Sequence, residues 1–436
     1  MADGTCAVRP YLAMPRAVVR VAIPTPPKDT DLSPRTRAAT AACAAFALTA
    51  LSGCSLITAD TPPNTLTVTD YYTAEPGNTA LTEILHSCGR QTGVTVVREV
   101  MPRSQLVPKL LRDGAAKSLP DLVLSDNPDL PKLASTGALL PLEGRVRTDG
   151  FYESVLEAGT YKNKLYGVAP GVNGLALFYD KAVFEKAGLE PPSTWKELRA
   201  SAAELTEGHR YGLALSAVAT EEGSWQYEPF FWGAGADLGK LDSAPSVSAL
   251  TYWTSLFRDG SISKSALNWQ QSDVAEQFIG HHAAMMINGS WQLAALSAEK
   301  DLDYGVVPLP TQKSGGSSVT PLGGETWAVP KGDKQDKAVK VLNCVLSQNH
   351  MIQWARLRAD VPADPAVAGQ LVKEQPDLAP FVASAPTARS RTAELGTAYP
   401  VVSKALYTAL QQAAIGQLSP GKALAAAQRQ AQSADH

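Results

Sequence analysis

Short strand patterns alternate with helical patterns along most of this 436-residue chain. Residues 66–68 alternate like a strand, and apolar residues then recur at helical spacing over 81–88, after a candidate helix cap at Asn78. Residues 120–124 are apolar throughout, as in a fully buried strand, and 130–138 follow with a helical pattern. This alternation predicts a sheet of parallel strands that is covered by helices.

The same order of patterns begins again after residue 174. A strand pattern at 175–179 leads into helical patterns, and one of these helices begins at Thr194 and Glu197, which have the spacing of a capping box. Residues 284–287 form another short apolar strand. We therefore expect two α/β lobes. No Gly-x-Gly-x-x-Gly motif follows the first strand, so the sequence gives no support to a dinucleotide site.

Composition and charge narrow the class of partner. The chain is 44% apolar and 19% charged, which is ordinary for a globular protein with enough length for two cores. Its formal net charge of -3 provides no basic field for nucleic acid. We expect no nucleic-acid partner and no cofactor.

The N-terminal region has the order of a secretory signal. Arg35 and Arg37 precede an uncharged run at 38–50, which is too short for a membrane-spanning helix of about 20 residues. The run ends in Leu-Ser-Gly-Cys54, and small residues before a cysteine resemble the lipobox of bacterial lipoproteins. Cys54 would then carry the lipid that anchors the protein to the extracellular face of the cell membrane. The alternative is a small buried cysteine at the end of an Ala-rich helix.

This interpretation divides the N-terminus into three parts. Residues 1–34 are an extension that precedes the true start, 35–53 are the signal peptide, and 54–65 are a tether. Removal of the signal takes away two of the five cysteines and leaves Cys54, Cys88 and Cys344. Two thiols besides the anchor, in an oxidising compartment, favour pairing, although two separately buried thiols remain the alternative.

Several segments together resemble the solute-binding proteins of carbohydrate ABC importers, the family of the maltose-binding protein and the actinobacterial trehalose-binding lipoproteins. The most specific is 161–180 (YKNKLYGVAPGVNGLALFYD), followed by 184–197. The other matching segments are 120–142, 278–291, 304–310 and 322–330. The resemblance covers nearly all of residues 65–430.

The resemblance implies a two-lobed α/β fold of the periplasmic-binding-protein type, type II and maltose-binding-like. Lobe 1 would comprise 66–170 plus 322–349, and lobe 2 would comprise 171–321 plus 350–436. The lobes would be joined by crossings near 170–171, 320–323 and 348–362, and would close around a ligand like a hinge. Implied partners are a sugar and the ABC permease subunits, with the protein a monomer. Cysteines in matching helices of the trehalose-binding relatives imply a Cys88–Cys344 disulfide within lobe 1.

A sugar ring presents hydroxyl groups and an apolar face, so its site needs carboxylates, amides and aromatic rings. Trp291 resembles a stacking position of the family, and it follows a Gly-containing loop segment. The full set of stacking candidates is Trp225, Trp232, Trp291 and Trp327. The tryptophans with helical spacing and apolar neighbours are expected in the core: Trp195, Trp253 and Trp354.

Among polar residues, Asp126 is the leading ligand candidate. It comes with Asn127 at the carboxyl end of a buried strand, where α/β sheets place their ligands, although an Asx turn or helix cap before Pro128 is the alternative. The other candidates, which lie in loops or at positions that resemble family contacts, are Tyr72, Glu75, Asn173, Asn288, Glu325, Arg358 and Asp360. Glu75 is equally typical of a solvated loop charge.

Enzymatic alternatives have weak support. Segments 261–264, 125–127 and 313–315 copy the three short motifs of penicillin-recognising serine enzymes, but they occur in the wrong order along the chain. No local pattern indicates the paired acids of a glycosidase, and we expect no enzyme. His281 and His282 are interpreted as a solvated helix end, and we expect no metal site.

The main alternative to a sugar-binding protein is a protein of the same fold that binds a cationic ligand. A polyamine would suit Asp126, Glu325 and the tryptophans. An anion is disfavoured, because the candidate residues include only one arginine, Arg358.

Overall fold

The computed structural model describes residues 62–73 and 75–433. The predicted extension, the signal peptide and Cys54 therefore lie outside the described residues. Of the predicted tether, Thr65 is already the first residue of a strand. No helix in the described part of the chain has both the length and the apolar character to cross a bilayer.

A five-stranded sheet forms the first lobe, in the order β2-β1-β3-β11-β6. Its strands are β1 (Thr65–Asp70), β2 (Thr95–Val100), β3 (Leu122–Asp126), β6 (Gly167–Val168) and β11 (Glu325–Ala328). β1 pairs in parallel with β2 and β3, as the strand and helix alternation predicts. β11 is antiparallel to both β3 and β6, because the chain inserts it on its return from the second lobe. The sheet is thus mixed.

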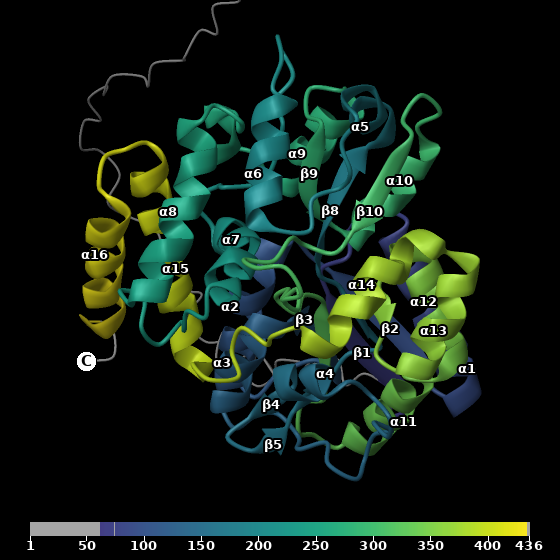
Figure 1. Ribbon diagram of the computed structural model, residues 1–436. Helices are drawn as coiled ribbons and strands as arrows, with labels where there is room; N and C mark the ends of the chain where they lie inside the picture. The colour runs from purple at the N-terminus through teal and green to yellow at the C-terminus, as the bar shows by residue number, and fades with distance from the viewer. Residues whose placement is uncertain (1–61, 74, 434–436) are drawn as a thin grey trace, which may run out of the picture. The chain divides into compact units, whose positions relative to one another are not determined.

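Helix α1 (Gly77–Thr92) packs against α11 (Gln335–Val345) and α12 (Gln348–Arg358), and Figure 1 shows the three helices together beside β1 and β2. α12, most of which the sequence placed in lobe 2, therefore packs against helices of lobe 1. The remaining elements of this lobe are α2 (Arg103–Ala115), η1 (Asn127–Asp129), α3 (Leu130–Ser135), α4 (Glu153–Ala158), β4 (Thr160–Tyr161) and β5 (Lys164–Leu165). α3 ends three residues before the predicted helix end at 138.

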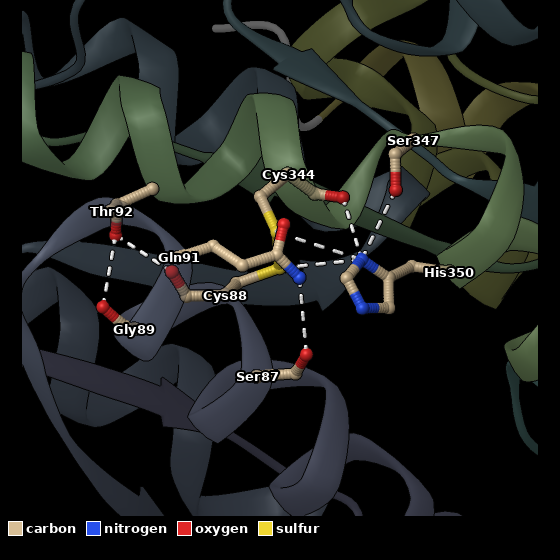
Figure 2. Close-up of a disulfide and its surroundings, with 8 residues drawn as sticks. All are labelled: Ser87, Cys88, Gly89, Gln91, Thr92, Cys344, Ser347 and His350. Atoms are coloured by element: carbon tan, nitrogen blue, oxygen red, sulfur yellow. Dashed lines mark hydrogen bonds between the residues drawn. A yellow bond between two sulfur atoms is a disulfide. The ribbon is translucent and has the colours of Figure 1, made fainter.

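The predicted disulfide between Cys88 and Cys344 is confirmed in this structure. Its Cα atoms lie 5.5 Å apart, and it joins α1 to α11 across 256 residues of sequence. Cys88 belongs to the buried stripe of α1, while Cys344 is half-buried at the surface of α11 (Figure 2).

The second lobe contains a three-stranded sheet, β10-β8-β9, formed by β8 (Leu175–Asp180), β9 (Met285–Gly289) and β10 (Tyr304–Val307). Both of these pairings are antiparallel, which corrects the parallel sheet expected from the repeated pattern. Parallel bridges do occur, but they join Ala214 to Met286 of β9 and Tyr211 to Ala283 just before β9, and residues 211–214 lie in a segment without regular strand structure. The sequence pattern therefore predicted where these strands lie along the chain, but not whether neighbouring strands run parallel or antiparallel.

Helices cover this second sheet, and Figure 1 shows α7 (Glu221–Gly233) beside α15 (Tyr399–Ala414), in agreement with their packing. The other helices are α5 (Lys181–Ala187), α6 (Trp195–Glu204), α8 (Ala244–Arg258), η2 (Lys264–Leu267), α9 (Gln271–Ile279), η3 (Ser290–Gln292), α10 (Leu293–Ala298) and α16 (Pro420–Ser433). α6 begins with the predicted capping box of Thr194 and Glu197. Trp195 and Trp253 are 5% and 1% exposed, so both are core residues as predicted.

The lobes are connected by segments that pair with one another. β7 (Gly171–Val172) is antiparallel to β12 (Val361–Pro362), and Asn173 bridges to Gly323. A further bridge joins Pro321 to Arg389, after the helical segment α13 (Pro365–Glu374), η4 (Pro376–Leu378), α14 (Ala379–Ser384) and η5 (Ala385–Thr387). A last turn, η6 (Gly396–Ala398), leads into α15.

Candidate ligand site between the lobes

A buried arginine joins the two lobes. The side chain of Arg391 is 4% exposed, and its Nη2 donates to Oδ1 of Asn127 at 2.9 Å while its Nη1 donates to Oε1 of Glu221 at 2.6 Å. Oδ1 of Asp126 lies 3.5 Å from the same guanidinium. Asp126 ends β3 in lobe 1 and Glu221 begins α7 in lobe 2, so Arg391 brings polar groups of both lobes to one place.

Asp126 and Asn127 also have local structural roles. Oδ1 of Asp126 accepts from the backbone N–H of Asn127 at 3.0 Å and so caps η1, which is the cap that the sequence left open as an alternative. Its other oxygen is paired with Arg103, whose side chain is 56% exposed. Asn127 donates to the carbonyl oxygen of Leu322 at 3.1 Å. Both side chains are therefore held in fixed orientations.

Two indole rings lie beside this polar group. Trp225 of α7 stacks on Trp291, with ring centroids 5.6 Å apart and an interplanar angle of 30°. The Arg391 guanidinium lies 5.8 Å from the Trp225 ring centroid. Trp225 is almost fully buried, whereas Trp291 is only partly buried. Of the two, Trp291 is the ring with more surface free for a ligand.

A carboxylate network continues behind Arg391 into lobe 2. The hydroxyl of Tyr399 lies 2.7 Å from Oε1 of Glu221 and 2.8 Å from Oε1 of Glu228. A hydroxyl carries one proton and can donate to only one of these oxygens, so the second contact needs a protonated carboxyl. Burial, with the neighbouring Glu221 charge, raises the pKa of Glu228 to about 8, which makes Glu228 the protonated partner at neutral pH.

Where β3 meets β11, a second group of polar and aromatic residues gathers. Glu325 is the cross-strand partner of Asp126, and its Oε1 accepts from the Tyr71 hydroxyl at 2.7 Å. The Arg358 guanidinium lies 5.1 Å from the ring centroid of the neighbouring Tyr72. This second group lies next to the first through the Asp126–Glu325 pair.

Asp360 closes this group at the third crossing. Its Oδ2 accepts from the indole N–H of Trp354 at 2.8 Å, and the residue is 1% exposed. Burial raises the pKa of Asp360 to about 7, although the nearby Arg358 charge opposes this shift. The neighbouring Asn173 of the first crossing also lowers the pKa of Asp360. The backbone pairing of Val361 with Val172 links the two crossings beside the site.

The comparisons with known proteins agree with this architecture. Residues 83–380 match the family model described as bacterial extracellular solute-binding protein. The chain belongs to this family.

Among the similar proteins is a binding protein of Brucella abortus (strain 2308), 26% identical over 311 residues that cover 68% of this chain and 75% of that protein. A maltooligosaccharide ABC transporter solute-binding lipoprotein of Streptococcus pneumoniae (strain ATCC BAA-255 / R6) is 23% identical over 314 residues, or 66% of this chain and 71% of that one. The crystal structure of the cyclic α-maltosyl-1,6-maltose binding protein of Arthrobacter globiformis superimposes with a TM-score of 0.75, at 24% identity, over 85% of this chain and 99% of that one. The structural likeness shows that this solute-binding protein has the predicted two-lobed, maltose-binding-like fold.

Three predicted site residues of this solute-binding protein have other roles in the structure. Trp327 is 1% exposed and lies on β11 within the lobe 1 core, so it offers no face for stacking. Trp232 is 6% exposed and packs in the lobe 2 core, with the Arg389 guanidinium 4.9 Å from its ring centroid. Glu75 is exposed and accepts from the backbone N–H of Thr79 at 3.1 Å in the first turn of α1, whose N-cap residue is Pro76 and not the predicted Asn78.

The side chain of Asn288 is also engaged in hydrogen bonds within the protein. It is fully buried, its Nδ2 donates to the carbonyl oxygen of Gln271 at 2.8 Å, and its Oδ1 accepts from the backbone N–H of Gly289 at 2.9 Å. It therefore holds the end of β9, which leads directly to Trp291. This arrangement gives Asn288 a supporting role.

Four residues of the site were not predicted from the sequence: Arg391, Glu221, Arg103 and Tyr71. The site therefore holds more arginines than the single Arg358 that was predicted. Arg391 lies in a segment without periodic pattern, 264 residues from its partner Asn127, so no local signal could have selected it. Tyr71 could have been predicted from the sequence, because it adjoins the candidate Tyr72 in the loop after the first strand.

The arrangement can hold a neutral polar ligand rather than a metal. Its donors are mostly guanidinium groups, amides and hydroxyls, and its carboxylates are largely paired. Among the described residues, only Cys88, Cys344 and His350 gather with the spacing of metal ligands, and they lie on α1, next to the end of α11, and on α12. His281, interpreted from sequence as a solvated helix end, is half-exposed, with Nδ1 3.0 Å from Oδ2 of Asp180.

Proposed function

We propose that this solute-binding protein captures an oligosaccharide of the maltooligosaccharide type between its lobes and delivers it to an ABC permease. One observation carries the proposal: the stacked Trp225–Trp291 pair adjoins the carboxylate, amide and guanidinium groups of Asp126, Asn127 and Arg391. The names of the similar maltooligosaccharide and cyclic maltosyl-maltose binding proteins support the same class of ligand.

The chemistry of the site suits a sugar. A pyranose ring stacks its C–H face on an indole and directs its hydroxyl groups toward planar polar groups around the ring. Asp126 accepts hydrogen bonds, Arg391 donates them, and Asn127 does both. Since each of these side chains is already held by the protein, little conformational entropy is lost when a ligand binds.

Calorimetry with maltotriose tests the ligand class, and spermidine serves as the cationic competitor. We expect maltotriose to bind and Trp291→Ala to lose on the order of 1 to 3 kcal/mol of binding free energy, because the partly exposed ring is removed. Trp327→Phe is the matched control: it changes a core aromatic and should keep the parent affinity. Binding of spermidine without binding of any oligosaccharide would refute the proposal.

The lipid anchor at Cys54 is part of the same proposal. It is supported by the basic segment, the short apolar run and the small residues before Cys54, and by the lipoprotein among the relatives. The parent should partition into the detergent phase of a phase separation, and Cys54→Ala should partition into the aqueous phase. Equal partitioning of the two proteins into detergent would exclude Cys54 as the anchor.

A further inference from the structure

The disulfide lies beside a buried histidine on a third helix. Nδ1 of His350 lies 3.4 Å from Sγ of Cys88 and 3.6 Å from Sγ of Cys344 (Figure 2). The three side chains come from α1, α11 and α12, and their donor atoms all lie within 4.8 Å of one another. Two cysteine sulfurs and one imidazole nitrogen are three of the four ligands of a tetrahedral zinc site.

We propose that the dithiol form of this protein binds one thiophilic cation of the zinc class through Cys88, Cys344 and His350. An external dithiol opens the site: it gives two electrons and two protons to the S–S bond and closes to its own disulfide. The cation then displaces the two thiol protons and binds the two thiolates. The oxidised protein cannot form this site, because both sulfurs are engaged in the disulfide.

His350 is positioned for the third bond. Its Nδ1 lies 2.9 Å from the carbonyl oxygen of Cys344, which only accepts hydrogen bonds, so Nδ1 carries the proton in the disulfide form. When a cation binds, Nδ1 gives up this proton and Nε2 takes one, which leaves the imidazole neutral. The net release is therefore two protons for each cation bound.

The surroundings favour a cation at this place. His350 is 8% exposed and so is held in place by packing, whereas Cys344 is half-buried and leaves a path from solvent. Oε1 of Gln91 lies 3.7 Å from Sγ of Cys344, on the exposed side, where water or this amide oxygen can complete the coordination. The bound cation would replace the lost covalent link between α1 and α11 and would add α12 to it.

Cadmium titration tests the proposal on the full chain with Cys6, Cys43 and Cys54 replaced by serine, so that only two cysteines remain. After reduction with a phosphine, which supplies the same two electrons, we expect one Cd²⁺ per chain, a thiolate-to-cadmium charge-transfer band, and release of two protons. Zn²⁺ should raise the Tm of the reduced protein and leave that of the oxidised protein unchanged.

Variants separate this site from adventitious binding. Cys88→Ser should abolish the charge-transfer band of a two-thiolate site. His350→Gln should weaken binding by at least about 10-fold, since even the loss of a group that only orients a ligand costs that much. Ser347→Ala is the matched control: its hydroxyl lies 3.1 Å from Nδ1 but is no ligand, and its affinity should match the parent. Unchanged affinity for Cd²⁺ in His350→Gln overturns the proposal. A reduced chain that does not bind Cd²⁺ also overturns it, whether the chain stays folded or fails to fold when Zn²⁺ is added.

Discussion

At the scale of single residues, Arg391 has the most consequential position. It is the buried cation that connects Asn127 and Asp126 of lobe 1 with Glu221 of lobe 2. When one member of a buried ion pair is removed, the other charge stays buried without a partner, and its desolvation cost is no longer offset. The same side chain therefore contributes both to stability and to the geometry of the proposed sugar site.

Arg391→Ala should lower the free energy of unfolding by about 3–5 kcal/mol, the range for breaking a buried ion pair. Arg356→Ala is the control, because the Arg356–Glu374 pair is solvent-exposed and worth at most about 1 kcal/mol. Urea unfolding measures both. Equal effects of the two substitutions would show that burial of Arg391 does not determine its contribution.

Glu228 should make stability depend on pH. Its pKa in the folded protein, about 8, lies above the ordinary value of 4.5, so the unfolded chain loses this proton first as the pH rises. The stabilising effect is complete below about pH 4.5 and is lost as the pH rises to about 8. Thermal melts give the Tm at each pH from 4 to 9. The Tm should vary less with pH in Glu228→Gln, which keeps a neutral side chain, than in the exposed control Glu276→Gln. Parallel profiles would contradict this assignment of the proton.

At the scale of elements, α6 shows how a short signal in sequence becomes a defined helix start. Oγ1 of Thr194 accepts from the backbone N–H of Glu197 at 3.2 Å, and Oε2 of Glu197 accepts from the backbone N–H of Thr194 at 3.0 Å. The capping box satisfies N–H groups that have no partner inside the helix. The next residue, Trp195, then enters the lobe 2 core.

Thr194→Ala should therefore cost about 1 kcal/mol of stability, as is typical of a lost N-cap. Thr251→Ala is matched in chemistry but lies on the exposed face of α8, where its hydroxyl donates only to the carbonyl oxygen of Val247. This control should change stability by no more than about 0.5 kcal/mol. A chemical denaturation curve for each variant decides, and an equal loss in both would argue against the cap.

At the scale of the whole molecule, the crossings set how the two lobes are joined, and Gly324 lies where the second crossing packs against the first. Its φ of 108° is in a region that residues with a side chain rarely adopt, and an added Cβ would lie 3.2 Å from Cα of Val172 in the first crossing. The third crossing, β12, pairs with the same segment. A side chain at 324 would thus disturb two of the crossings together.

Gly324→Ala should destabilise the protein by about 1–3 kcal/mol, the usual cost of a strained backbone conformation. It should also weaken binding of maltotriose, because the backbone of Gly324 accepts from the N–H of Asn127 in the ligand site. Gly332→Ala is the control, since a Cβ there meets no neighbour within 4 Å. Calorimetry and urea unfolding measure the two effects, and parent-like behaviour of Gly324→Ala would show that the crossings tolerate the side chain.

Local sequence determined the features that depend on neighbouring residues. Strands 66–68 and 175–179, the buried run 120–124, and the capping box of α6 all follow from side-chain periodicity and capping chemistry, which act over a few residues. Resemblance extended this to the two-lobed fold and to the disulfide between Cys88 and Cys344. These predictions needed no knowledge of which surfaces meet.

Only the tertiary structure decided which residues are buried and which distant residues lie next to one another. Trp291 and Trp327 both follow Gly-containing segments, yet β11 inserts between β3 and β6 and buries Trp327, whereas Trp291 follows β9 and stays partly exposed. Arg391 reaches Asn127 only because the chain returns to the crossings after α14, and strand directions in the second sheet depend on the same path. Burial and pairing across hundreds of residues are set by how the lobes pack, and no local pattern records that packing.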